Sequence, residues 1–127
     1  AMSLAYSDAA IKELEEAGHI VISTPMYNMA IPACLKAWID QVIRINVTFS
    51  YDAAGRKLGL LRNKKMYLAI ASGRVHGTGN YRVDFIADYL RVVFKGIGIT
   101  DISVYRVEGT AEALVDEISY SQLITDL

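Results

Sequence analysis

The chain has 127 residues, which is enough for one domain and too few for two. Apolar residues make up 53% of it and charged residues 21%, a composition typical of a folded globular protein and not of a disordered one. A net charge of −1, from 13 basic and 14 acidic side chains, gives no electrostatic reason to expect a nucleic acid or a membrane surface as partner.

The cysteine count and the apolar runs exclude several kinds of site and indicate a cellular compartment. A single cysteine, Cys34, excludes an internal disulfide and a cysteine-based zinc site. No apolar run approaches the ~20 residues that span a bilayer, and the first residues lack a signal-peptide pattern. We therefore expect a cytoplasmic protein without a membrane segment.

The first predicted elements are a short helix and a strand. Ser7 or Asp8 can cap the helix, which ends near residue 17 and turns Ile11 and Leu14 inward. The strand covers residues 19–24, and its centre, 20–22, is continuously apolar. Such a run predicts a central parallel strand that is covered on both faces.

A polar and aromatic turn, residues 25–31, follows this strand and leads into the strongest helical pattern of the chain. Pro32 suits the first turn of that helix, because a proline there loses no hydrogen bond. Apolar residues recur with i, i+3, i+4 and i+7 spacing, which predicts an inward face. The predicted inward residues are Cys34, Leu35, Trp38, Ile39, Val42 and Ile43. On this face, Cys34 is interpreted as a small buried hydrophobe.

Residues 46–63 form a long connection, with a possible two-stranded excursion around residues 52–55. A second strand is predicted over 65–71, followed by a polar, glycine-bearing loop over 72–79. The next helix runs from about 81 to 95, a third strand with edge-like alternation covers 101–107, and a last helix covers about 111–123. The residues predicted to face inward from the 81–95 helix are Phe85, Ile86, Tyr89, Leu90, Val93 and Phe94.

The predicted order, α, β, α, β, α, β, α, indicates a parallel sheet with helices packed on it and right-handed crossovers. In open α/β sheets, ligands bind beyond the carboxyl ends of the strands. The turn after the first strand and the loop after the second therefore form the candidate site.

Several motifs of the chain resemble those of one known protein family. These are the turn Pro25-Met26-Tyr27-Asn28-Met29-Ala30-Ile31-Pro32 with Leu35-Lys36 and Asp40 after it, then residues 47–51, 72–76 and 96–101. They are similar to the FMN-dependent NADH-azoreductase and NAD(P)H:quinone oxidoreductase family. The resemblance implies an α/β, flavodoxin-like, three-layer parallel sheet, here as a single partial domain over residues 1–127.

The resemblance also implies a set of site residues. The expected flavin contacts are Met26, Tyr27, Asn28, Met29, Ser72, Gly73, Arg74 and Val75. The expected aromatic lid over the substrate is made by Phe49 and Tyr51, with His76 beside them. Each has a simpler interpretation: Tyr27 as a capping aromatic, Asn28 as a turn residue, and Arg74 and His76 as solvated loop residues. The two lid rings can equally be explained by packing within their own loop.

The N-terminal part of the family's fold has no counterpart in these residues. The three predicted strands correspond to strands 3, 4 and 5 of the 2-1-3-4-5 order, so strands 1 and 2 and the phosphate loop are absent. FMN binding would then be weak or lost, and the first strand would present a bare edge. Three explanations stay open: the chain is part of a longer protein, another chain supplies the missing half, or two copies pair through their open edges.

Two functions follow from these observations. The first is an FMN-dependent oxidoreductase, a homodimer, that passes hydride from NADH or NADPH through the flavin to a quinone or azo compound. The second is a truncated, flavin-free flavodoxin-like module that acts only in subunit association.

Overall fold

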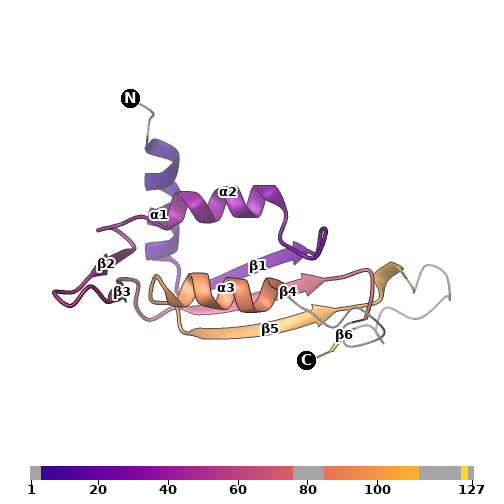
Figure 1. The fold of residues 1–127 in the computed structure, drawn as a ribbon. Coiled ribbons are helices and arrows are strands. Elements are labelled where there is room, and N and C mark those ends of the chain that lie inside the picture. The colour runs from indigo at the N-terminus through magenta and orange to yellow at the C-terminus, as the bar shows by residue number, and fades with distance from the viewer. Residues whose placement is uncertain (1–3, 76–84, 112–123, 126–127) are drawn as a thin grey trace.

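A computed structural model of the chain describes residues 4–75, 85–111 and 124–125 (Figure 1). The described helices are α1 (Ala5–Glu16), α2 (Ala33–Val42) and α3 (Phe85–Lys95). The described strands are β1 (His19–Pro25), β2 (Phe49–Tyr51), β3 (Lys57–Gly59), β4 (Lys65–Ala71), β5 (Asp101–Val107) and β6 (Ile124–Thr125).

The main sheet has the strand order β1-β4-β5-β6. The pairs β1–β4 and β4–β5 are parallel, as the alternation of elements predicted. His19 is paired with Lys65, and Lys65 with Asp101, so the long strands begin at one level and their carboxyl ends are aligned. The bounds predicted for the second and third strands are confirmed, and β1 extends one residue further than predicted. The unpredicted β6 pairs antiparallel with the end of β5, so β5 is an edge strand over only part of its length.

The core lies between one face of this sheet and the described helices. Alternate strand residues are buried: Ile20 and Ile22 in β1, and Met66, Leu68 and Ile70 in β4. They form a single apolar cluster with buried residues of α1, α2 and α3, including the predicted Ile11 and Leu14. The described residues therefore form two layers, a sheet and helices on one of its faces, and not the three layers expected (Figure 1).

The prediction that β1 is covered on both faces is wrong for the described residues. Burial alternates along the strand, and Val21 is 70% exposed. β1 is an edge strand of the sheet, and the described helices pack only on the opposite face from Val21. A continuous apolar run indicates that both faces of a strand favour burial. It does not indicate that the elements covering both faces belong to the same stretch of chain.

Three details of the helices also differ from the predictions. Neither Ser7 nor Asp8 caps α1: the N-cap is Leu4, and Ser7 lies inside the helix, where its Oγ donates to the Gln41 carbonyl oxygen at 2.7 Å. Pro32 is the N-cap of α2 and does not lie in its first turn. Cys34, predicted to be buried, is exposed. It lies one turn before the half-buried Trp38, at the edge of the helix face that α2 buries.

Phe85 is exposed for the same reason, since it lies one turn before the half-buried Tyr89. With Val92 it borders an open groove of about 910 Å³ between α2 and α3. The groove reaches the turn between β1 and α2 at Ala30 and Ile31. The first residues of the helix predicted over 81–95, and nearly all of the helix predicted over 111–123, lie outside the described residues.

The predicted excursion around residues 52–55 is confirmed as an antiparallel hairpin of β2 and β3. It lies at the amino ends of the long strands, beyond the body of the sheet (Figure 1). The chain after β3 joins this end of the sheet, where the Leu61 N–H donates to the Ile97 carbonyl oxygen at 2.9 Å. Within the described part of the chain, no helix is both long enough and apolar enough to cross a bilayer.

Candidate functional site

The chain leaves β1 through a tight two-residue turn. Met26 continues the sheet, since its N–H donates to the Ala71 carbonyl oxygen at 2.8 Å. Tyr27 and Ala30 then bond to each other in both directions, at 2.9 and 3.0 Å. Between them, Asn28 (φ 49°) and Met29 (φ 69°) both occupy the left-handed region. Two positive φ angles in succession define a type I′ turn, which reverses the chain before α2 begins.

The loop after β4 is held from the side of β5. The Ser72 N–H donates to the Val107 carbonyl oxygen at 2.9 Å, and the Ser72 Oγ donates to the Arg74 carbonyl oxygen at 2.8 Å. The Ser72 carbonyl oxygen accepts from both the N–H and the Oγ of Thr110, each at 3.1 Å. The Ala111 N–H donates to the Gly73 carbonyl oxygen at 3.1 Å. The first residues of the loop are thus fixed relative to the sheet.

Turn and loop meet around a cavity of about 190 Å³ at the carboxyl ends of β1 and β4. Its lining contains seven of the eight predicted flavin contacts: Met26, Asn28, Met29, Ser72, Gly73, Arg74 and Val75. The eighth, Tyr27, lies outside this lining, with its side chain 61% exposed. The sequence therefore predicted which two segments come together, although they are more than 40 residues apart.

The predicted lid residues lie elsewhere within this chain. Phe49 and Tyr51 belong to β2, at the amino ends of the strands, whereas the cavity lies at the carboxyl ends (Figure 1). Their rings contact each other edge to face, with centroids 5.8 Å apart, and Lys57 Nζ lies 4.2 Å from the Phe49 centroid. His76, the third residue of this group, lies outside the described residues.

Sequence reasoning missed the residues that brace the site from β5. Thr110 and Ala111 hold the Ser72 loop, but they were interpreted only as the entry to a helix. The rule that placed the other two segments, that sites follow the carboxyl ends of parallel strands, applies equally to this third strand. In the described residues there is no group of three His, Cys, Asp or Glu side chains that could hold a metal ion.

The size of the cavity bears on which ligand fits. Small-molecule sites usually enclose roughly 300 to 1,000 Å³, and this cavity, at about 190 Å³, is smaller. Its lining combines small and apolar residues with the polar Asn28 and the charged Arg74, at the carboxyl ends of adjacent strands. A cavity of this volume has room for one edge of a flat ring system, and the rest of a nucleotide would need contacts beyond it.

Comparison with known proteins gives a consistent result. The profile of the family described as flavodoxin-like fold matches residues 1–124. The FMN-dependent NADH:quinone oxidoreductase 1 of Colwellia psychrerythraea is 50% identical over 107 residues, which cover 84% of this chain and 54% of that protein. The FMN-dependent NADH:quinone oxidoreductase of Beijerinckia indica is 47% identical over 115 residues, 88% of this chain and 56% of that protein.

Solved structures resemble the chain to a similar extent. An azoreductase from Bacillus anthracis superposes with a TM-score of 0.78 at 29% identity, over 89% of this chain and 54% of that one. An FMN-dependent NADH-azoreductase from the same species, solved in complex with FMN, superposes with a TM-score of 0.76 at 28% identity, over 94% of this chain and 59% of that one. The chain thus spans little more than half the length of these relatives.

Proposed function

Because the chain belongs to the flavodoxin-like fold family, we propose that its cavity binds one edge of the isoalloxazine ring of FMN. We propose further that the chain forms part of an FMN-dependent oxidoreductase that uses NADH or NADPH to reduce quinones or azo compounds. One observation carries the proposal: seven residues that resemblance assigned to the flavin line a single cavity. The names of the similar proteins, FMN-dependent NADH:quinone oxidoreductases and azoreductases, support these two substrate classes and favour NADH.

The chain's own part in this reaction is to bind and orient the ring. When bound, FMN supplies the hydride-transfer chemistry, and the protein supplies position and surroundings. The type I′ turn presents Asn28 and Met29 to one side of the cavity, and the braced Ser72 loop closes another side. Tyr27 stands next to the cavity with an exposed ring, which is available to stack on a flat ligand.

The aromatic lid, in this proposal, requires a second copy of the chain. Phe49 and Tyr51 cannot cover the cavity of their own chain from the opposite end of the sheet (Figure 1). In a homodimer, the hairpin of one copy can approach the cavity of the other. The proposed enzyme is therefore a homodimer with the flavin near the interface.

A second candidate function rests on a different observation. β1 is an edge strand whose outer face carries an exposed Val21, and an exposed apolar edge is a ready surface for strand pairing. In this alternative, the chain is a flavin-free module that acts only in subunit association. Flavin binding separates the two functions.

The test is a titration of FMN with the purified chain, followed by flavin fluorescence. We expect saturable binding and a dissociation constant that rises up to about tenfold in Tyr27→Ala, the range for loss of one aromatic stacking contact. Tyr6→Ala is the matched control, since Tyr6 lies on α1 and is 65% exposed, much as Tyr27 is. If a large excess of chain leaves flavin fluorescence unchanged, the enzyme proposal fails. Equal effects of the two substitutions would remove Tyr27 from the site.

A further inference from the structure

The hairpin of β2 and β3 depends on its base for its position. Each strand has three residues, and neither pairs with the main sheet. A two-stranded hairpin of this size is at best marginally stable in water. Its tip is ordered internally by Asp52, which accepts from the N–H groups of Ala54 and Arg56, both at 2.9 Å. In the described residues, the hairpin is held at two places near its base. The end of β3 lies close to the backbone of Ile97 and Gly98 at Gly59, and β2 follows the end of α2, where the angle between helix and hairpin is set.

Thr48 occupies this junction and is fully buried. Its Oγ donates to the carbonyl oxygen of Val42, the last residue of α2, at 2.7 Å. The same Oγ accepts from the Arg44 N–H at 2.9 Å. The Thr48 carbonyl oxygen accepts from the N–H of Leu60, just after β3, at 2.9 Å. The carbonyls of the last helical turn lack partners within a helix, so Thr48 both completes the end of α2 and joins it to the hairpin.

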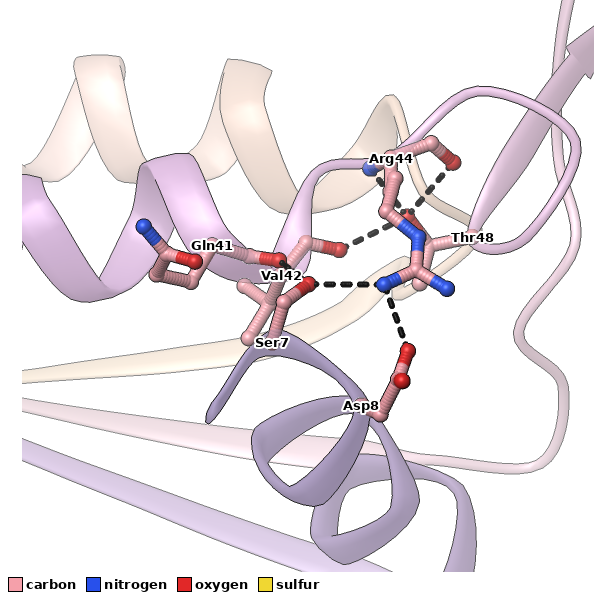
Figure 2. A network of polar contacts seen from close by, with 6 residues as sticks. All are labelled: Ser7, Asp8, Gln41, Val42, Arg44 and Thr48. Atoms are coloured by element: carbon pink, nitrogen blue, oxygen red, sulfur yellow. Dashed lines mark hydrogen bonds and ion pairs between the residues drawn. The ribbon is translucent and has the colours of Figure 1, made fainter. Parts of the chain in front are cut away.

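A second set of contacts ties this junction to α1, as Figure 2 shows. Arg44 Nη1 donates to Ser7 Oγ at 2.9 Å and to Asp8 Oδ1 at 2.7 Å. Ser7 Oγ in turn donates to the Gln41 carbonyl oxygen at 2.7 Å. We call this network the Thr48 clamp; its residues are Ser7, Asp8, Gln41, Val42, Arg44 and Thr48. The clamp fastens α1, the end of α2 and the base of the hairpin to one another.

We propose that Thr48 is a positioning residue: its hydroxyl fixes the angle at which the hairpin leaves α2, and so the placement of the Phe49 and Tyr51 rings. This inference rests on the proposed function, in which those rings cover the flavin site of a second copy. One helix joins the two features, because α2 begins shortly after the turn at Asn28 and Met29 and ends at the clamp. With ten residues it is about 15 Å long. A change of angle at its end therefore moves the rings relative to the body of their own chain, and so relative to the flavin site of the second copy that they are proposed to cover.

The rings move as a unit when the angle changes. Phe49 and Tyr51 are in edge-to-face contact, and Lys57 on β3 lies over the Phe49 ring. Phe49 directly follows Thr48, and its carbonyl oxygen accepts from the Asn46 N–H at 2.7 Å. Phe49 also packs against the hydrophobic core, so loss of the Thr48 hydroxyl leaves the pair of rings and this core contact in place and loosens the junction between the hairpin and α2. We therefore expect binding of the electron acceptor to weaken and binding of the flavin to stay the same.

Thr48→Val tests the proposal, because valine keeps the shape of the side chain and removes the hydroxyl. Thr48→Ser restores the hydroxyl, and Thr100→Val at the exposed Thr100 is the matched control. Hydrogen exchange is measured for peptides covering residues 49–59 and 65–71. FMN binding and steady-state kinetics with NADH and 1,4-benzoquinone are measured on the same preparations.

In Thr48→Val we expect hydrogen exchange to be faster by roughly tenfold in residues 49–59 and unchanged in residues 65–71. We also expect the KM for benzoquinone to rise severalfold, with kcat and the dissociation constant of FMN within about twofold of the parent, since only the acceptor contact is loosened. Thr48→Ser should restore both the exchange rate and the KM.

Two results would overturn the inference. One is a Thr48→Val protein that matches Thr100→Val in hairpin exchange and in KM. The other is exchange that accelerates equally in residues 49–59 and 65–71, which would give Thr48 a merely structural role in global stability. Failure of the parent chain to bind FMN would refute the proposed function, while hydrogen exchange would still decide whether Thr48 fixes the hairpin.

Discussion

Met29 is held in a backbone conformation that its side chain disfavours. It is the second central residue of a type I′ turn and has a φ of 69°, where glycine is the preferred residue. A residue with a Cβ atom in the left-handed region costs about 1–2 kcal/mol. Asn28, at the other central position, belongs to the few residue types that tolerate this region. The strain of the turn is therefore concentrated at Met29.

Two substitutions isolate this strain. Met29→Ala and Met29→Gly both remove the half-buried methionine side chain, so the loss of its contacts is common to both. Alanine keeps the Cβ and its strain of about 1–2 kcal/mol, while glycine removes the strain and adds a cost of about 0.5–1 kcal/mol for greater freedom of the unfolded chain. The glycine variant should thus be more stable than the alanine variant by about 0.5–1 kcal/mol.

The assay is urea unfolding followed by circular dichroism, with the free energy of unfolding extrapolated to water for the parent and both variants. FMN titration on the same proteins measures the cost to the site, since Met29 lines the cavity. We expect both variants to bind FMN more weakly than the parent, although one of them has the more relaxed turn. An alanine variant as stable as the glycine variant would refute the idea that the turn is strained. Flavin affinity equal to that of the parent would remove the Met29 side chain from the site.

Two further predictions concern the hairpin end of the sheet. Gly98→Ala should lower the free energy of unfolding by more than about 2 kcal/mol, because its Cβ would overlap the Leu61 carbonyl oxygen and its φ is +104°. Gly18→Ala, with no atom within 4 Å of its Cβ, should be nearly neutral in the same urea titration. Hydrogen bonds from the Arg56 backbone and side chain lower the pKa of Asp52. A carboxylate with a lowered pKa stabilises the folded state at neutral pH, and this contribution is lost as the pH falls through the folded pKa. An Asp52 carboxyl carbon that titrates by NMR at the ordinary aspartate value would contradict this.

The strands, and the two segments that meet at the candidate site, could be predicted because both depend on short-range patterns. The bounds of β4 and β5 were predicted correctly from apolar runs that end in polar turns. The rule on the carboxyl ends of parallel strands then predicted that residues 26–29 and 72–75 lie together. This rule needs only the order of the elements and a parallel sheet. It does not need the register, which the structure supplies.

The features that were missed depend on neighbours that are distant in the sequence. The exposure of Val21 depends on which layer covers the outer face of β1, and that of Cys34 on the width of the stripe that α2 buries. Ser7 has the chemistry of a helix cap, but a partner on α2 draws it into the helix interior. The left-handed φ of Met29 follows from the tight reversal between β1 and α2, and no propensity of methionine indicates it.

The edge of β1 gives the last prediction. One side of this strand pairs with β4 and the other is the edge of the sheet, with a 70% exposed Val21 on its uncovered face. Apolar strand edges associate unless charges or a covering element prevent it, and a lysine is a common natural protection. We therefore expect the chain to be oligomeric by light scattering and Val21→Lys to reduce its mass to that of a monomer.

The matched control for this prediction is Val92→Lys on α3, where the parent valine is 73% exposed and borders the α2–α3 groove. It introduces the same charge at a similar exposure on the helical face. A monomeric parent chain would show that the edge of β1 does not drive association. Dissociation by Val92→Lys alone would move the interface from the edge strand to the helix groove. In that case the hairpin of one copy would approach the cavity of the other across the helical face, because the groove and the cavity share the turn that precedes α2.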